Sequence, residues 1–208
     1  MKIEITVPTS LNEITLEQYQ KFLKIAEENP EGNFLNAKMI EIFCGIPLSD
    51  SYKLKMSSVS AIIDILNEML NVTPNHVQYG FIPDLDEMSL GEYIDLDNNI
   101  SSWAEMHKAM NVLYRPVKIK KGDKYSVEDY DVSNPEALKD MPLDAAIGAV
   151  FFFLNLGLEL SKHTILYSNL EEMEDIQEQL ILEENGVGIN HFMLSLEEML
   201  QDLKISLN

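Results

Sequence analysis

The side chains of this sequence that could bind a metal ion are acidic residues that gather in its middle. They are Asp84, Asp86, Glu87, Glu92, Asp95 and Asp97. The start Asp84-x-Asp86 is typical of a calcium loop, which requires glycine at its sixth position and glutamate at its twelfth. Ser89 and Asp95 occupy those positions, so the calcium pattern fails. A magnesium site remains one interpretation; we prefer solvated turns and helix N-termini, where acidic residues are favoured.

Residues for acid–base or nucleophilic catalysis form no known pattern. The histidines and the single cysteine are His76, His107, His163, His191 and Cys44. No two histidines have the spacing of a zinc-binding His-Glu-x-x-His helix. Cys44 lies in an apolar context, which favours a small buried residue over a nucleophile. The sequence therefore predicts no catalytic residues, no metal site and no cofactor, and we expect the protein not to be an enzyme.

Charge divides the chain into one basic segment and an acidic remainder. There are 15 Lys and Arg against 35 Asp and Glu, a formal net charge of −20. This balance argues against a general nucleic-acid binder and against an anionic membrane surface. The basic segment holds Arg115, Lys118, Lys120, Lys121 and Lys124. We predict that these five bind a partner, and the candidates are a nucleic acid, which a single arginine supports only weakly, and an acidic patch on another copy of the chain.

Two acidic segments near the C-terminus, 170–184 and 191–207, have apolar residues at helical spacing. Such helices pack as a hairpin on the core, or they offer an apolar face to a partner segment. Both interpretations stay open. On the second one we assign partner binding to Phe192, Leu196, Met199 and Leu203.

Most of the elements that position these residues are predicted to be helices. We expect helices over 16–28, 36–43, 57–70, 89–96, 101–114, 145–160, 170–184 and 191–207. Strands are expected over 2–7 and 77–82, each followed by a proline, and a hairpin over 117–130 that turns at 121–123. The fold class is therefore mainly α with a small antiparallel β element, α+β. The apolar run 145–160 falls short of the roughly 20 residues of a membrane span and predicts a buried core helix.

Two segments 74 residues apart resemble each other, LNEITLEQY at 11–19 and LDEMSLGEY at 85–93. Each contains a predicted capping box, Thr15 with Gln18 and Ser89 with Glu92. Their shared Leu and Tyr, and the paired Ile14 and Met88, are expected to pack where each helix begins. An internal duplication of a strand–turn–helix–helix unit explains the similarity, and so does chance, because helix starts use few residue types.

The sequence suggests three segments that together form one domain. Residues 1–75 make the first strand–helix unit, and residues 76–135 make the second one with the basic hairpin. Residues 136–208 hold the core helix and the two acidic helices. A chain of 208 residues is long enough to bury one core of this kind.

Four stretches together resemble small acidic proteins encoded among the tail genes of tailed bacteriophages, the tail assembly chaperones and baseplate-hub assembly proteins. They are LNEITLEQYQKF, GFIPDLDEMSLGEYIDLD, WAEMHKAMNVLYRPV and MPLDAAIGAVFFFLNLG. The helix start 89–93 after a short strand is a feature of such proteins. The resemblance covers residues 1–160. It implies a non-enzymatic protein of the host cytoplasm or the virion that binds a virion or tail component before or during assembly.

The sequence leaves other functions open. The first is a permanent structural component of the virion, and the second is an acidic inhibitor that imitates nucleic acid. A metal-dependent enzyme built on the acidic cluster between Asp84 and Asp97 ranks last. Self-association of the chain is open as well.

Overall fold

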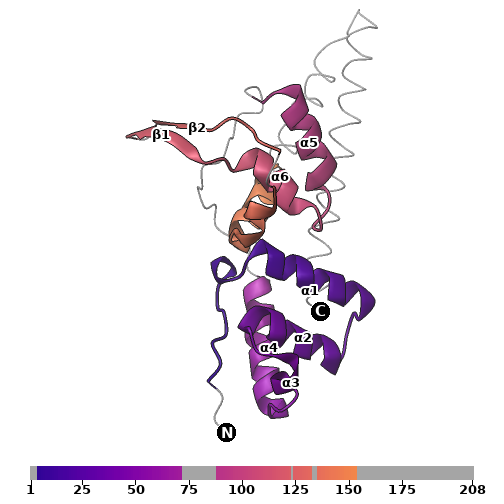
Figure 1. Cartoon of the computed structure of the whole chain (residues 1–208). Helices are drawn as coiled ribbons and strands as arrows, with labels where there is room; N and C mark the ends of the chain where they lie inside the picture. The colour runs from indigo at the N-terminus through magenta and orange to yellow at the C-terminus, as the bar shows by residue number, and fades with distance from the viewer. Residues whose placement is uncertain (1–3, 72–87, 123, 133–134, 154–208) are drawn as a thin grey trace, which may run out of the picture.

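The computed structural model describes residues 4–71, 88–122, 124–132 and 135–153. Within these ranges the chain is mainly helical, with one small antiparallel hairpin, as the sequence predicts (Figure 1). Among the described helices, none combines the length and the apolar character that crossing a bilayer requires. The predicted strand 77–82 and the predicted helices 170–184 and 191–207 lie outside the described residues.

The first group of elements packs around helices α1 and α2. It consists of η1 (Leu11–Glu13), α1 (Leu16–Glu28), α2 (Asn33–Cys44), α3 (Leu48–Ser51) and α4 (Met56–Leu70). α1 and α4 both pack against α2, and Phe22 of α1 meets Phe43 of α2 with ring centroids 5.3 Å apart. α2 ends at Gly45, whose φ of 67° is the left-handed conformation that glycine adopts without strain.

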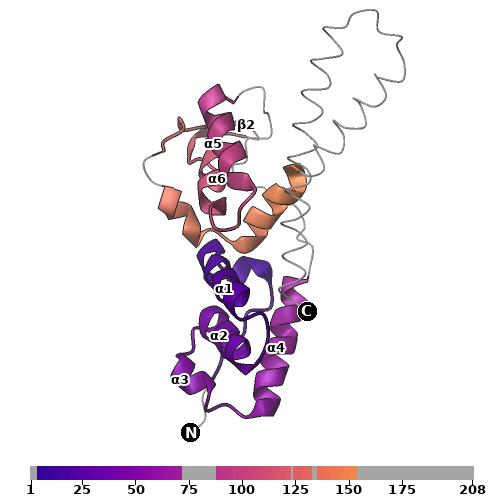
Figure 2. The ribbon, with the colours of Figure 1, turned by 90° about the vertical axis from the view of Figure 1, so that its right-hand side faces the viewer.

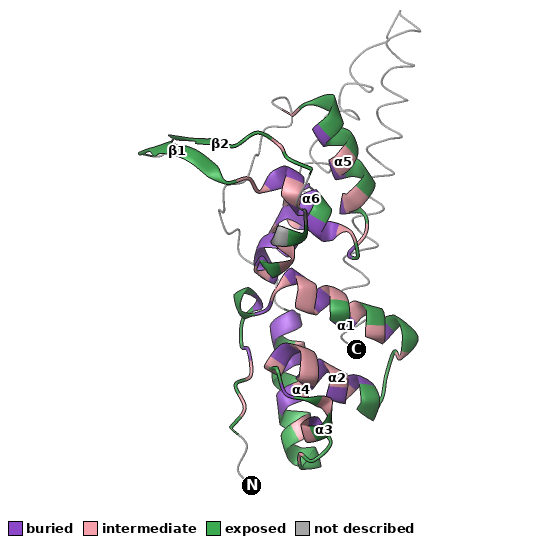
Figure 3. Cartoon of the chain, in the orientation of Figure 1, coloured by how far each residue is buried: buried purple, intermediate pink, exposed green. Residues whose placement is uncertain are grey.

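The second group of elements carries the hairpin. It consists of α5 (Leu90–Ile100), α6 (Met106–Leu113), β1 (Val117–Lys121), β2 (Lys124–Val127), η2 (Pro135–Asp140) and a helical stretch over 143–153. α6 packs against both α5 and η2. Every residue of α6 except Lys108 and the half-buried Asn111 is buried, so α6 is the centre of this group (Figure 3).

Reciprocal hydrogen bonds join the two groups, which stack one above the other in Figure 2. The Leu16 N–H donates to Met141 O and the Leu143 N–H donates to Ile14 O, both at 2.9 Å. Each bond satisfies an N–H at the start of a helix, a group that has no partner within its own helix. Beside them, Tyr19 of α1 meets Trp103 edge to face with ring centroids 5.1 Å apart. The buried apolar residues of both groups consequently form one core.

Several predicted elements differ from the structure. The predicted strand 2–7 is wrong over its described part, because residues 4–9 form no strand. Ile5 and Val7 alternate because one side of this extended segment packs against the core, which gives strand periodicity without a strand partner. The predicted helix 101–114 begins only at Met106, after turns at 101–105, and the core helix begins at 143.

Both predicted capping boxes form. Thr15 and Gln18 exchange hydrogen bonds of 2.8 and 3.1 Å, and Ser89 and Glu92 exchange bonds of 2.6 and 3.4 Å.

The two similar segments nevertheless pack differently. Leu16 and Tyr19 are fully buried, whereas their counterparts Leu90 and Tyr93 are 75% and 52% exposed. The prediction that these residues pack at the helix start is correct for α1. At α5 it is wrong for Leu90 and Tyr93, whereas Met88, the counterpart of the buried Ile14, is partly buried against the core. The similarity thus extends to the way each helix begins and not to what covers it.

We predict that Ser89→Ala lowers the free energy of unfolding by about 1 kcal/mol, because the Glu92 N–H in the first turn of α5 loses its side-chain acceptor. Ser60→Ala is the matched control, since Ser60 is exposed within α4, where alanine is the better helix former. Urea denaturation of both variants measures the difference. An unchanged midpoint for Ser89→Ala would mean that the cap contributes nothing.

Candidate protein-interaction site

The hairpin is the most exposed element of the described chain. β1 and β2 pair antiparallel, and Lys121 faces Lys124 across a turn at Gly122, whose φ is +64°. All five residues of β1 and the first three of β2 are exposed. The hairpin projects from the helices in Figure 1 and is almost wholly green in Figure 3. An isolated two-stranded hairpin is marginal in water, so this one depends on the attachment at its base.

Lysines and apolar residues share the surface of the hairpin. Lys118, Lys120, Lys121 and Lys124 are exposed, and none of them makes an ion pair with another residue of the described ranges. Val117, Ile119 and Tyr125 are also exposed. A surface of this composition suits contact with an acidic partner that also offers apolar area.

Arg115 has a different role from the four lysines. Its guanidinium Nη2 lies 2.5 Å from Glu92 Oε1, and the two side chains are only 12% and 10% exposed. The guanidinium also lies over the ring of Tyr130, 5.7 Å from the centroid, and Nε donates to Val112 O at 3.3 Å. Arg115 is therefore engaged within the chain, and the cations presented to a partner are the four lysines.

These contacts fasten both ends of the hairpin to α5. Arg115 precedes β1, and Tyr130, which follows β2, donates from its hydroxyl to Asp95 Oδ2 at 2.9 Å. Glu92 is also the acidic member of the α5 capping box. One carboxylate consequently caps α5 and holds the arginine at the base of the hairpin.

The lowered pKa of Glu92 agrees with an ion pair between Glu92 and Arg115. Burial alone would raise the pKa of Glu92, but the hydrogen bonds from Ser89 and the nearby positive charge of Arg115 outweigh it, so that the pKa lies below its ordinary value of 4.5. Burial and the bond to Asp95 raise the pKa of Tyr130 to about 12, so its hydroxyl keeps its proton. Glu92 is thus ionised and Tyr130 neutral at pH 7.

Most of the other residues considered for chemistry lie outside the described ranges, and Asp97 is exposed on α5. Phe192, Leu196, Met199 and Leu203 lie outside, and so do Asp84, Asp86, Glu87, His76, His163 and His191. Burial raises the pKa of the Cys44 thiol to about 11, which keeps it protonated. In the described part of the chain, no three side chains of the metal-binding types lie close enough together to hold an ion.

His107 is buried where the two groups of elements meet. Its Nδ1 lies 3.2 Å from Gln20 Nε2, and its Nε2 lies 3.4 Å from Glu136 Oε1. Since the Gln20 amide donates, Nδ1 accepts, which suits a neutral ring. Burial lowers the pKa of His107, in agreement with that assignment. These contacts indicate that His107 helps to hold the two groups of elements together.

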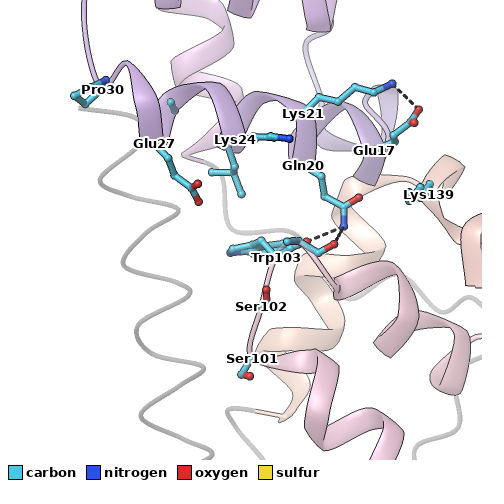
Figure 4. A pocket seen from close by; sticks show the side chains of 13 residues that line it. Glu17, Gln20, Lys21, Lys24, Glu27, Pro30, Ser101, Ser102, Trp103 and Lys139 are labelled. Atoms are coloured by element: carbon cyan, nitrogen blue, oxygen red, sulfur yellow. Dashed lines mark hydrogen bonds and ion pairs between the residues drawn. The ribbon is translucent and has the colours of Figure 1, made fainter.

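An open hollow of about 940 Å³ lies beside this junction, between α1 and residues 101–104 (Figure 4). Gln20 crosses it to donate to Trp103 O at 2.7 Å, and Lys21 pairs with Glu17 at 3.0 Å. The lining mixes charges of both signs with apolar side chains. Among its described lining residues, the hydroxyls are those of Ser101 and Ser102, and the acid Glu17 is already paired with Lys21.

Sequence reasoning missed an apolar face on α5. Leu90, Tyr93 and Ile94 are exposed together, and their spacing places them on one side of the helix. The spacing was visible in the sequence, but it is the same spacing that marks a buried face, so only the structure shows that this side points outward.

The chain matches no family model, no curated protein and no solved structure.

We predict that Glu92→Gln destabilises the protein by about 3 kcal/mol at pH 7, because Arg115 is left without its counter-charge. The carboxylate stabilises the fold above pH 4.5, and this contribution disappears as the pH falls through its lowered folded pKa. The difference in the free energy of unfolding between wild type and Glu92→Gln should therefore decrease as the pH is lowered. Urea denaturation between neutral and acidic pH measures it.

Glu17→Gln is the matched control. Its carboxylate pairs with Lys21 at the surface, where ion pairs contribute about 0–1 kcal/mol. A loss of stability in Glu92→Gln that is the same at all pH values would contradict an ion pair between Glu92 and Arg115.

Proposed function

We propose that this chain is a non-enzymatic assembly factor that binds a protein partner through its basic hairpin. The observation that carries the proposal is that both ends of an exposed hairpin are fastened to a packed helical body. β1 is exposed along its whole length and adds nothing to the core. A buried ion pair and a cation–π contact nevertheless hold its base in place. An element that is anchored but not packed is suited to contact with another molecule.

The composition of the hairpin supports a protein partner over nucleic acid. Four exposed lysines stand on a chain of net charge −20, and its only arginine is engaged with Glu92. Contacts to phosphates need several free Lys or Arg, and the acidic remainder would repel a nucleic acid. Exposed Val117 and Ile119 add apolar area, which protein contacts use.

The resemblance to tailed-bacteriophage proteins suggests the kind of partner. Under this proposal the partner is a virion or tail component, met in the host cytoplasm, and the chain acts as a tail assembly chaperone or a baseplate assembly factor. A strongly negative carrier stays soluble and does not self-aggregate, which suits the handling of an aggregation-prone protein.

The test is capture of partners by the tagged full chain from the cells that produce it, with mass spectrometry of the captured proteins and of purified particles. We expect a tail component to be captured. Absence of the chain from mature particles would indicate a transient factor, and its presence at fixed stoichiometry would indicate a structural component. Capture of a nucleic-acid enzyme alone would contradict the proposal and favour the acidic inhibitor.

We predict that reversing Lys118, Lys120 and Lys121 to Glu lowers capture of the partner at least about tenfold while the thermal midpoint stays near that of wild type, because the three side chains are exposed and unpaired among the described residues. A matched control reverses exposed Lys24 of α1 and Lys55, the residue before α4. Undiminished capture by the triple variant at low salt would exclude the hairpin lysines from the contact.

A further inference from the structure

We propose that His107 is a pH-sensitive latch between the two groups of elements, and that protonation of its ring releases Gln20 and loosens the contact between α1 and residues 103–104. This latch is independent of the hairpin and of the partner proposed for it. Histidine is the side chain whose charge changes in the mildly acidic range. His107 of α6 is only 4% exposed and lies against Gln20 of α1, so its charge acts directly on the contact between the two groups.

Two backbone carbonyls fix the orientation of the Gln20 side-chain amide. Its Nε2 donates to Trp103 O at 2.7 Å and to Ala104 O at 3.2 Å. Only the nitrogen of an amide can donate, so the nitrogen must face these two oxygens. The same nitrogen lies 3.2 Å from His107 Nδ1, which must therefore accept. This arrangement requires a neutral imidazole that carries its proton on Nε2, beside Glu136 Oε1.

A second proton on the ring of His107 meets a donor instead of an acceptor. A protonated imidazole donates from both nitrogens, so its Nδ1–H would point at the NH₂ group of Gln20. Turning the amide over brings its oxygen to Nδ1, but this oxygen then faces the carbonyls of Trp103 and Ala104, which lose their donor. Neither orientation satisfies all the groups, and a buried polar group without a partner destabilises a fold. Protonation of His107 consequently opposes the contact between α1 and residues 103–104.

The acids around this junction each have a lysine as a counter-charge. The pairs are Glu136–Lys139 on η2, Glu105–Lys108 at the start of α6, and Glu17–Lys21 on α1, which presents the uncharged Gln20 to the ring. An acid that is already paired stabilises an imidazolium less than a free acid does. Burial has the largest effect and lowers the pKa of His107 below its ordinary value of 6.5, and the charge of Lys139 acts in the same direction.

The sign of the pH dependence follows from this lowered pKa. The unfolded chain takes up the proton at the ordinary pKa of 6.5, whereas the buried ring takes it up at a lower pH. The latch is therefore formed above pH 6.5, and its contribution to stability is lost as the pH falls below that value. The pKa values of Glu105 and Glu136 lie below 4.5, so these two acids keep their charge while the histidine titrates.

The test uses the fluorescence of Trp103, the only tryptophan of the chain. Trp103 is 6% exposed and its carbonyl accepts the shortest bond from Gln20, so its emission and its quenching by acrylamide report on the junction. The full chain is titrated between about pH 8 and about pH 5, the range in which histidine changes its charge. Below pH 6.5 we expect a shift of the emission to longer wavelength and stronger quenching, with unchanged helical circular dichroism.

Two variants assign the transition to one histidine. His107→Asn keeps an acceptor near the position of Nδ1 but cannot take up a proton, so its emission should stay constant over this range. The matched control combines His76→Gln, His163→Gln and His191→Gln, which leaves His107 as the only histidine, and it should retain the wild-type transition. A transition that persists in His107→Asn, or that disappears from the control, would overturn the latch.

Nuclear magnetic resonance of the ring nitrogens in the same control decides the question even if His107→Asn does not fold. We expect the neutral ring to carry its proton on Nε2 and the second proton to bind below pH 6.5, with the midpoint that the fluorescence gives. A neutral ring protonated on Nδ1, or a midpoint above 6.5, would overturn the proposal. Two further results would do the same: wild-type fluorescence that does not change over the titration, and loss of the helical circular dichroism at the same midpoint, which would mean global unfolding.

Discussion

The buried ion pair between Glu92 and Arg115 is the interaction on which the second half of the structure depends. Two charges with little exposure are costly to bury unless each is paired and hydrogen-bonded. Here Glu92 meets both requirements, because it accepts from the Ser89 N–H and lies 2.5 Å from the guanidinium. The same carboxylate therefore begins α5 and fixes where β1 leaves α6. Together with the Tyr130–Asp95 hydrogen bond, it holds the base of the hairpin against α5.

This constraint explains why an element that buries nothing is held in a defined position. The helices supply the apolar core, which is shared by both groups of elements. The backbone hydrogen bonds of Leu16 and Leu143 join the two groups. Arg115 and Tyr130 attach the base of the hairpin to this packed body. Its exposed lysines are then available to a partner, and this combination of a packed body and an exposed hairpin is why we propose an assembly factor.

Local sequence signals predicted more of this structure than long-range ones. The capping boxes at Thr15 and Ser89 and the turn at Gly122 depend on neighbouring residues, and they appear where expected. Arg115 looked like one of five surface cations because its partner Glu92 lies 23 residues earlier in the chain. Periodicity has the same limit, since it shows which side of α5 is apolar and not which side is covered.

The central claim is that the hairpin is a place of contact with a protein partner, and amide hydrogen exchange of the full chain, alone and bound to its captured partner, tests it most directly. The amide groups of the largely buried helix α2 serve as the internal reference. The account predicts that the amide groups of β1 and β2 exchange more slowly in the complex than in the free chain. Exchange in the hairpin that is the same with and without the partner would contradict it.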